Sequence, residues 1–291
     1  MRRTQARSPR ARKASFGLIA AQLLAAPVLV GIAYTVAATL GVAGAGAHGL
    51  DVGRLVRVAT ERATWAGLAW TMWVSAAATI LAACGAVLAV IAFRGHGWLE
   101  KIGMTLSTFP LMVPHLVAAM LGLWLLSQSG MLARVAITAG WIDQPTAMPA
   151  LVYDRFGIGL ILTYAWKEFA FLAVVASALL ATRGDAAEEA ARTLGASPWV
   201  AFRRVTWPVL WRGLAPAIVS VFIFVAGNYE AAALLAPSDP LALPLLIAER
   251  AADPDLARRG DAYVASALLL VIAGVAVLVH ELMRAKWEPL S

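Results

Sequence analysis

Charge and cysteine are both scarce in this chain. Only 14% of its 291 residues are charged, whereas 61% are hydrophobic and the mean hydropathy is +0.75. Soluble domains carry about 25% charged residues, so this composition predicts a protein that is surrounded by lipid. The single Cys84 has no second cysteine for a disulfide or a thiolate metal cluster, and its place inside an apolar run predicts a packing role.

The motifs of nucleotide and metal chemistry are absent or incomplete. The sequence holds no G-x-x-x-x-G-K-[ST] loop, so we expect the chain to bind no ATP itself. "HELMR", which begins at His280, has Arg284 where a zinc-binding helix needs its second histidine. "GAGAHG" at 44–49 matches G-x-G-x-x-G but follows an apolar run and not a strand, which predicts a flexible loop. We therefore expect no catalytic residue, no metal site and no cofactor bound by this chain, and we predict that it is not an enzyme.

Long runs without charge predict the fold class. No Asp, Glu, Lys or Arg occurs in the gaps 14–50, 63–93 and 102–133, and three further apolar runs contain few charges. A helix needs about 20 residues to cross the hydrocarbon core of a bilayer. The sequence thus predicts an all-α integral membrane protein with six transmembrane helices, near 15–40, 66–93, 102–126, 156–182, 208–235 and 262–283.

The distribution of Lys and Arg predicts the orientation of these helices. If the basic tail at 1–14 is cytoplasmic, the inner segments carry 15 Lys and Arg residues and the outer segments carry 8. Cytoplasmic loops carry the excess of positive charge, so both termini, including 285–291, are predicted to be cytoplasmic and 41–65 to be an extracytoplasmic loop. The net charge of +7 then faces anionic lipid headgroups, and nucleic acid is not needed to explain it. The apolar run of the first helix is longer than that of a signal peptide, so we interpret it as a membrane anchor.

Polar side chains inside the predicted helices are candidate pathway residues. Glu230 and Asn228 fall in the fifth helix, and the adjacent Lys167 and Glu168 fall in the fourth. Lipid cannot solvate an ionisable group, so such residues face protein or water and often line a transport pathway. A structural hydrogen bond between helices remains the alternative for each of them.

His115 lies where the third helix is predicted to break. It follows Pro114 in "FPLMVPHLVAAM", and a second proline, Pro110, lies four residues earlier. Prolines remove backbone donors and kink or break a helix, which a membrane protein tolerates where the break lines a cavity. His115 is therefore another candidate for the lining of a pathway.

A polar stretch between the fourth and fifth helices predicts two short helices joined by a turn. "AAEEAARTL" contains strong helix formers, and Glu188 lies three residues after Asp185 in a pattern that resembles a capping box. Gly195 can adopt a positive φ and end this helix. Ser197 as N-cap and Pro198 at the first position then begin a second short helix, and Pro208 is predicted to open the fifth transmembrane helix.

The second short helix presents aromatic and basic residues. Trp199 and Phe202 are three apart and share a face, while Arg203 and Arg204 follow them. A protein partner could bury this face, or the helix could lie on the lipid surface, and the physical pattern leaves both readings open.

This stretch resembles the cytoplasmic EAA motif of permease subunits of binding-protein-dependent ABC importers, written EAA-x3-G-x9-I-x-L-P. Residue types, spacing and the predicted membrane side all agree. Val205 in place of Ile and Trp207 in place of Leu are conservative departures. The matching residues are Glu189, Ala190, Ala191, Gly195, Val205, Trp207 and Pro208.

The resemblance implies a type I ABC importer permease fold with a permease core at 66–284. It implies that the loop 185–207 docks on an ABC ATPase dimer, which would hold ATP and Mg²⁺. Glu189 would orient the loop, Ala190 and Ala191 would permit close approach, and Gly195 would form the turn. The residues implied in this coupling are Glu188, Glu189, Ala190, Ala191, Gly195, Ser197, Pro198, Trp199, Phe202, Arg203 and Pro208.

The same resemblance implies further partners and a location. A second permease subunit, identical or homologous, would complete the pathway, and an extracytoplasmic solute-binding protein would dock on the outer loops. Membrane lipids would surround the chain in the prokaryotic plasma (inner) membrane.

The solute is less well indicated. Many sugar permeases carry Asp before the motif glycine, whereas this chain has Leu194, which resembles permeases for polyamines, thiamine, ferric iron or oxyanions. Glu230 would suit a cationic solute, and a sugar or sugar phosphate remains open. The competing classes are an ATP-independent secondary transporter, for which we find no internal repeat, and a membrane enzyme, for which the four histidines are too scattered.

Overall fold

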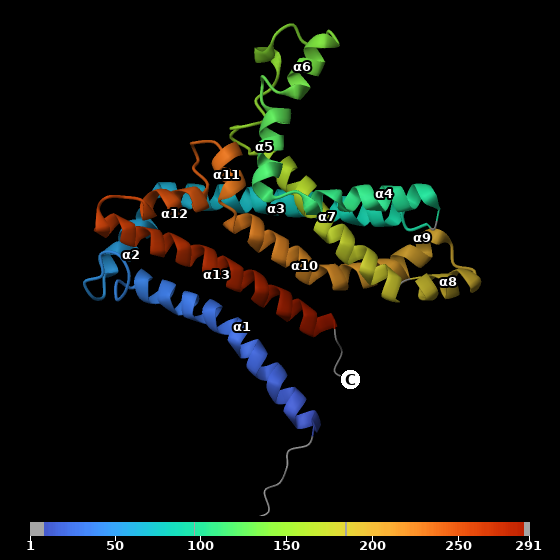
Figure 1. The fold of residues 1–291 in the computed structure, drawn as a ribbon, viewed down its shortest axis with the longest axis horizontal. Coiled ribbons are helices and arrows are strands. Elements are labelled where there is room, and N and C mark those ends of the chain that lie inside the picture. The colour runs from blue at the N-terminus through green and yellow to red at the C-terminus, as the bar shows by residue number, and fades with distance from the viewer. Residues whose placement is uncertain (1–8, 96, 184, 288–291) are drawn as a thin grey trace, which may run out of the picture. The chain divides into compact units, whose positions relative to one another are not determined.

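The computed structural model describes residues 9–95, 97–183 and 185–287, with side chains described for 21–95, 97–182 and 187–287. All regular elements in these ranges are helices (Figure 1). Among the described residues, six helices are long and apolar enough to cross a membrane, which confirms the predicted fold class. The basic residues before Pro9 and the last four residues of the predicted C-terminal end lie outside the described residues.

The principal helices follow one another along the chain, and the longest connections are 40–51, before α2, and 139–157, before α7, which contains the 3-10 helix Pro145–Ala147 (Figure 1). A 3-10 helix, Phe109–Met112, lies between α4 and α5, and a π-helical segment, Phe202–Thr206, lies between α9 and α10. The bounds are α1 Pro9–Thr39, α2 Val52–Thr60, α3 Arg62–Ala92, α4 Trp98–Thr108, α5 His115–Leu126, α6 Met131–Thr138, α7 Ile158–Arg183, α8 Asp185–Thr193, α9 Pro198–Ala201, α10 Trp207–Gly227, α11 Glu230–Leu235, α12 Leu243–Ala251 and α13 Leu256–Trp287.

One compact unit contains the residues up to Thr60 together with Arg250–Leu270. Within it, the buried Arg54 of α2 donates hydrogen bonds to the backbone oxygens of Ala38, at 3.2 Å, and Gly46, at 3.0 Å. Arg57 donates two hydrogen bonds to the carboxylate of Asp261. The predicted loop at 41–65 therefore contains an ordered helix that arginine side chains hold in place.

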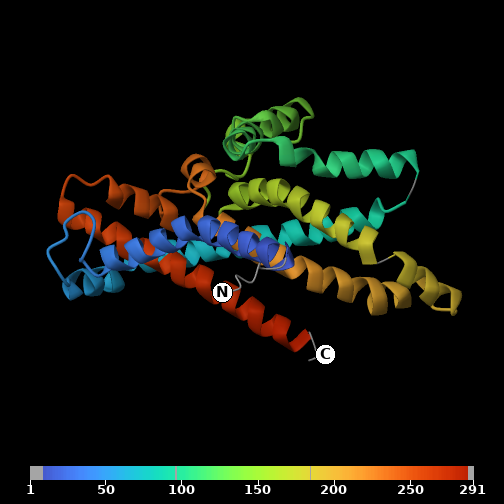
Figure 2. The same cartoon turned by 60° about the horizontal axis from the view of Figure 1, so that its bottom comes forward.

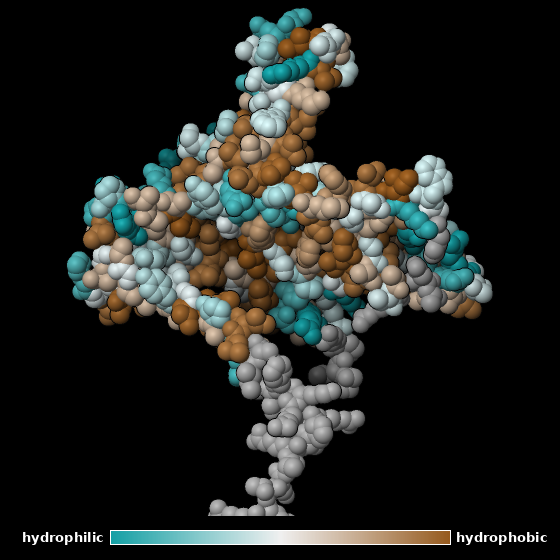
Figure 3. All heavy atoms as spheres, in the orientation of Figure 1, coloured by the Kyte–Doolittle hydropathy of each residue, from teal (hydrophilic) through white to brown (hydrophobic). Residues whose placement is uncertain are grey.

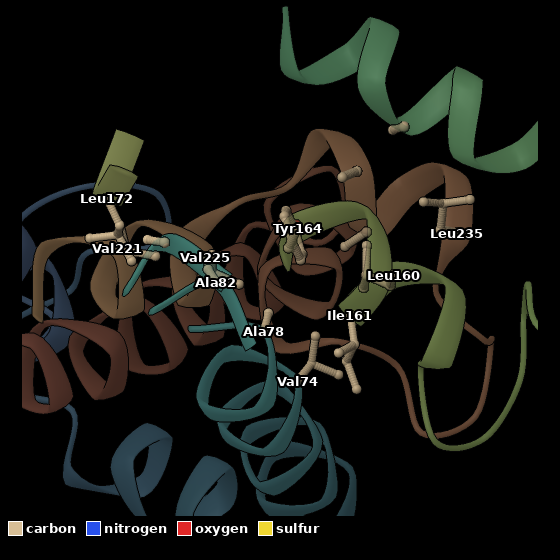
Figure 4. Close-up of a cluster of buried hydrophobic side chains, with 14 of the residues drawn as sticks. Val74, Ala78, Ala82, Leu160, Ile161, Tyr164, Leu172, Val221, Val225 and Leu235 are labelled. Atoms are coloured by element: carbon tan, nitrogen blue, oxygen red, sulfur yellow. The ribbon is translucent and has the colours of Figure 1, made fainter. Parts of the chain in front are cut away.

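The second unit contains Glu61–Glu249 and the rest of α13 from Val271. Its core is a packed group of α3, α7 and α10, with α11 beside them (Figures 2 and 4). On α3 a buried stripe recurs every four residues, and the small Ala78, Ala82 and Ala86 in its middle let the helix axes come close together in a membrane protein. The labelled core residues in Figure 4 are Val74, Ala78, Ala82, Leu160, Ile161, Tyr164, Leu172, Val221, Val225 and Leu235.

Two predicted transmembrane helices are broken in the structure. The predicted helix 102–126 is interrupted after Thr108 and begins again at His115, since Pro110 and Pro114 cannot donate backbone hydrogen bonds. The apolar span there is His115–Thr138. The predicted helix 208–235 is wrong at both ends, because the helical run begins at Pro198 and α10 ends at Gly227.

The last helix is longer than the sequence pattern indicated. It was expected at 262–283 but runs from Leu256 to Trp287, because the charged residues near its ends continue the helix beyond the apolar run. The first helix of the second unit likewise begins at Arg62, earlier than the predicted 66.

The surface of the long helices is apolar. Many large hydrophobic side chains are exposed along α1, α3, α5, α10 and α13. Figure 3 shows brown, hydrophobic residues over the middle of the long helices and teal, hydrophilic residues near α8 and around α6. This pattern is typical of helices whose outer faces contact membrane lipid.

Candidate functional site

The first candidate site is the segment 185–207, called here the EAA loop, and its turn is built on Gly195. The N–H of Gly195 donates to the oxygen of Arg192 at 2.9 Å, and the N–H of Ala196 donates to the oxygen of Ala191 at 3.1 Å. This pair of bonds is a Schellman motif, which ends α8 and requires a positive φ at Gly195, where φ is +89°. A β-carbon at Gly195 would meet no other atom of the chain, so the backbone conformation alone demands glycine there.

The second half of the EAA loop begins at Ser197 as predicted. The Ser197 side chain accepts a hydrogen bond from the N–H of Val200 at 3.4 Å, and Pro198 occupies the first turn of α9. The helix then continues into α10 without a break (Figure 1). The predictions of a separate short helix and of a fifth transmembrane helix that begins at Pro208 are therefore wrong. One continuous helical run extends from Pro198 to Gly227.

A change of helical register makes this continuity feasible. The N–H of Trp207 donates to the oxygen of Phe202, five residues back, which defines the π-helical segment. In a regular α-helix the Pro208 ring would clash with the carbonyl of Arg204 and leave it without a donor. The wider π turn removes that conflict, and Pro208 lies in the first turn of α10.

An ion pair at the buried Glu188 fixes the EAA loop to the rest of the unit. The carboxylate of Glu188 accepts two hydrogen bonds from Arg94, at 2.7 and 2.9 Å, and one from the hydroxyl of Thr206. Arg94 follows α3, so three segments meet at Glu188. The hydrogen bond from Arg94, together with that from Thr206, lowers the pKa of Glu188 below its ordinary value. The sequence pattern had assigned Glu188 to a capping box and gave no sign of this pair.

The face of the EAA loop beyond this ion pair is exposed. Glu189 and Ala190 are exposed on α8, Ala191 is half-buried, and Leu194 next to the turn is 89% exposed. Trp199 is also exposed. Glu189, Ala190, Leu194 and Trp199 therefore form a surface that no other part of the described chain covers.

The second candidate site lies at the break between α10 and α11. His115, at the start of α5, forms a 2.9 Å contact between its Nε2 and the carboxylate of Glu168 on α7. Its ring also packs on Phe224 of α10, with 4.7 Å between centroids. Glu168 is buried, and in the described structure it contacts His115 on another helix of the same chain.

Asn228 and Glu230 lie beside this pair. The side-chain oxygen of Asn228 accepts hydrogen bonds from the hydroxyl of Tyr164, at 3.0 Å, and from the N–H of Ala231, at 3.1 Å. Asn228 thus caps α11 and ties it to α7. Glu230 is the first residue of α11, outside the fifth transmembrane helix in which the sequence had placed it, and its side chain is exposed.

These residues surround an open depression of about 650 Å³, called here the Asn228 depression. Of the five predicted pathway residues, three line it, namely His115, Asn228 and Glu230. Glu168 does not line the depression but contacts His115, which does. Lys167 is buried in α7 and is not part of the lining. Tyr164 and Phe224 were missed, because a lone aromatic residue in an apolar helix carries no sequence signal for a site.

No group of three or more His, Cys, Asp or Glu side chains that could hold a metal ion occurs among the described residues. The two sites therefore offer a protein-binding surface and a polar depression, with hydrogen-bonding and charged groups as their chemistry.

Comparison with known sequences identifies relatives over most of the chain. The family described as "Binding-protein-dependent transport system inner membrane component" matches residues 82–285. The molybdenum transport system permease protein ModB of Mycobacterium tuberculosis is 27% identical over 79% of this chain and 83% of its own length. The sulfate transport system permease protein CysT of Synechococcus elongatus is 28% identical over 81% of this chain and 82% of its own length.

A longer relative matches only in part. The galactooligosaccharides transport system permease protein GanP of Bacillus subtilis is 28% identical over 56% of this chain. The chain spans 39% of the length of GanP.

Solved structures share the fold. A bacterial ABC transporter involved in the import of the acidic polysaccharide alginate has a chain that superposes with a TM-score of 0.69 at 16% identity, covering 96% of this chain and 99% of that one. A second structure of a bacterial alginate ABC transporter, in complex with an alginate pentasaccharide-bound periplasmic protein, gives a TM-score of 0.66 at 18% identity over 92% and 94% of the two chains. At these identities the likeness is one of fold.

Proposed function

This chain belongs to the family of binding-protein-dependent transport system inner membrane components, and from that premise we propose that it couples ATP hydrolysis by a separate ATPase to solute uptake. The chain is a multi-pass membrane protein and a permease of the ABC importer type. The coupling role is assigned to the EAA loop, and half of the solute pathway to the helices of the second unit.

The geometry of the EAA loop is the observation that carries this proposal. Its outer face is exposed at Glu189, Ala190 and Leu194, while Glu188 ties the loop to Arg94 and joins the two halves of the loop through Thr206. A surface that transmits force must be accessible to its partner and rigidly joined to the moving helices. The EAA loop meets both conditions, since its second half continues into α10.

The partners follow from the same role. An ABC ATPase dimer would dock on the EAA loop and would hold the ATP and Mg²⁺, so this chain would be the non-catalytic subunit. A second permease subunit would complete the pathway, and a solute-binding protein would deliver the solute from outside. The alginate transporter in complex with a periplasmic protein supports this last partner. The location would be the prokaryotic inner membrane.

An oxyanion is the first candidate for the solute. Relatives whose length this chain matches over more than four fifths carry molybdenum and sulfate permease names, and Leu194 stands where many sugar permeases carry Asp. A cationic solute is the second candidate, because the exposed carboxylate of Glu230 faces the Asn228 depression and would repel an anion.

The test has two stages. The tagged chain is co-expressed with candidate ABC ATPase, permease and binding-protein subunits from the same genome, and recovery of the ATPase is compared between wild type and Glu189→Ala. We expect the ATPase with wild type and reduced recovery or uncoupled hydrolysis with the variant. Failure of wild type to recover the ATPase, under conditions that preserve a known importer, would contradict the coupling role.

Uptake then separates the solutes. Proteoliposomes that contain the assembled importer are supplied with molybdate, sulfate, a polyamine or a sugar, with and without ATP. If an oxyanion is transported, Glu230→Gln should leave uptake unchanged or raise it. If a polyamine is transported, the same variant should reduce uptake, and ATP-independent uptake would indicate a secondary transporter.

A further inference from the structure

Four aromatic rings form a continuous ladder from α9 into α10. Trp199 stacks on Phe202 with 5.9 Å between centroids, Phe202 contacts Trp207 at 6.3 Å, and Trp207 stacks on Trp211 at 6.1 Å. Trp199, Trp207 and Trp211 are exposed. The ladder is therefore a surface feature that runs from the EAA loop along the first part of a membrane-crossing helix.

The π-helical segment creates this ladder. Residues five apart in a regular α-helix point about 140° away from each other, so Phe202 and Trp207 would lie on different faces. The π register, with its bond from the N–H of Trp207 to the oxygen of Phe202, brings them onto one face. Without the register change the aromatic surface would be divided into two separate pairs.

The charged residues that flank the ladder in sequence have one sign, and the nearby carboxylate of Glu188 is paired with Arg94 and Thr206. No Asp or Glu occurs between Glu189 and Glu230, whereas Arg203, Arg204 and Arg212 all lie beside the ladder in sequence and are exposed. Aromatic rings next to arginines at the end of a transmembrane helix fit the interfacial region of a bilayer, where rings lie at headgroup depth and guanidinium groups bind phosphate. An anionic headgroup complements the arginines, whereas a zwitterionic one does so only in part.

We propose that this ladder and its arginines form a binding surface for anionic phospholipid headgroups, which hold the EAA loop against the cytoplasmic leaflet. The inference rests on the proposed function, because that function places the loop on the cytoplasmic side. The continuity of α9 with α10 places the ladder at the start of a helical run that is long and apolar enough to cross a membrane. The anionic lipid would therefore set the position from which the EAA loop meets the ATPase, through Glu189 and the Gly195 turn. Trp199, Phe202 and Arg203, which the resemblance implied in the ATPase contact, are here assigned to the membrane-facing side.

The first measurement is lipid binding to the purified chain. Detergent-solubilised wild type is titrated with phosphatidylglycerol, with phosphatidylcholine and with inorganic phosphate, and bound lipid is counted by native mass spectrometry. We expect preferential binding of phosphatidylglycerol that inorganic phosphate does not compete away. The double variant Arg204→Gln with Arg212→Gln should weaken this binding by about fivefold for each arginine removed. Lys101→Gln, an exposed cation on the same predicted side at α4, is the matched control and should change nothing.

The second measurement is coupling in a membrane. The assembled importer is placed in nanodiscs of phosphatidylcholine alone or with graded phosphatidylglycerol, and solute-stimulated ATP hydrolysis is recorded. Anionic lipid should raise coupling in wild type, and the double variant should lose most of that response. Trp207→Leu, which keeps the site apolar but divides the ladder, gives an independent variant and should also reduce the response.

Three results would overturn the inference. Equal binding of both lipids to wild type would remove the headgroup preference, and an unchanged lipid response in the double variant would remove the role of the arginines. Loss of the ATPase from the double variant in lipid-free detergent would show that the ladder contacts the ATPase instead. Failure of wild type to bind the ATPase at all would count against the proposed function and leave the lipid titration to decide this inference by itself.

Discussion

The EAA loop and the Asn228 depression differ in how their parts are distributed along the chain. The turn and caps of the loop come from residues within one short stretch, with Gly195, Ser197 and Pro198 close together in sequence. The depression is assembled from α5, α10 and α11, and its polar residues are bonded to α7. Local backbone chemistry therefore specifies the first site, whereas tertiary packing specifies the second.

This difference predicts how each site fails. A substitution in the EAA loop should affect the loop and its contact with a partner while the core helices stay intact. A substitution at the buried members of the depression should affect the packing of several helices at once. The predictions below start with the largest expected effect.

The ion pair between Glu188 and Arg94 joins the EAA loop to the end of α3, and breaking it should have the largest effect. Arg94→Ala leaves the Thr206 hydroxyl as the remaining hydrogen-bond donor to the buried Glu188 carboxylate among the described side chains, so α8 should lose on the order of 2 kcal/mol of local stability. Hydrogen exchange of the α8 amides in detergent should accelerate by more than tenfold, while α7 amides in the core remain protected.

A double-mutant cycle with Glu188→Gln provides the control. The two changes together should cost less than the sum of each alone, because they remove the same interaction. Additive costs would show that Arg94 stabilises the loop through other contacts.

The His115–Glu168 contact allows the depression to be tested in the same way. His115→Ala leaves Glu168 buried without its partner and removes the ring contact with Phe224, so the free energy of unfolding should fall by about 1–2 kcal/mol. The change should appear as a lower thermal unfolding temperature of the whole second unit. His48→Ala, at a histidine outside this unit, should leave that temperature unchanged, and an equal fall in both variants would contradict the tertiary role of His115.

The N-cap at Ser197 should have a smaller and local effect. Ser197→Ala removes the acceptor for the N–H of Val200, and because that bond is long at 3.4 Å the cost should be near 0.5 kcal/mol, at the low end for caps. This loss should be measured as slightly faster hydrogen exchange of the α9 amides. Ser197→Asp restores an acceptor and should recover protection, and if it does not, the cap contributes nothing to α9.

Lowering the pH should have the smallest effect of all, and near neutral pH it should leave the stability of α8 unchanged. Because Arg94 lowers the pKa of Glu188 in the folded state, the stabilisation from this pair is fully present above the ordinary glutamate pKa and is lost as the pH falls through the lowered value. Exchange protection of α8 should thus be constant from about pH 7 to pH 5 and fall in stronger acid. Glu188→Gln should lack that fall, and a similar fall in the variant would assign the acid response to another group.

The sequence predicted the helical membrane fold because uncharged runs of sufficient length leave few alternatives. It also predicted the turn at Gly195 and the break before His115, since glycine and proline act on their own backbone. It failed to predict that Pro208 lies inside a continuous run, because a π turn can accommodate a proline where an α turn cannot. The partner of Glu188 was also missed, because Arg94 is far away in sequence and no local pattern joins the two.

The C-terminal end of α10, next to the Asn228 depression, could not be predicted from the sequence either. An apolar run continues past Gly227, and composition gave no reason to end the helix there. The structure ends it because Asn228 caps the next helix with its side chain and binds Tyr164. Glu230 consequently lies at the start of α11 and not within a transmembrane helix.

The central claim, that the EAA loop is the element that couples this permease to an ATPase, is tested most directly by a matched pair of glycine variants. Gly195 and Gly140 both have positive φ, +89° and +71°, and a β-carbon at either would meet no atom of the chain, so Trp imposes similar backbone strain at both. Each variant is co-purified with the ATPase. The account predicts that Gly140→Trp retains the ATPase as wild type does and that Gly195→Trp loses it or hydrolyses ATP without uptake. Equal retention and equal coupling in the two variants would contradict the claim.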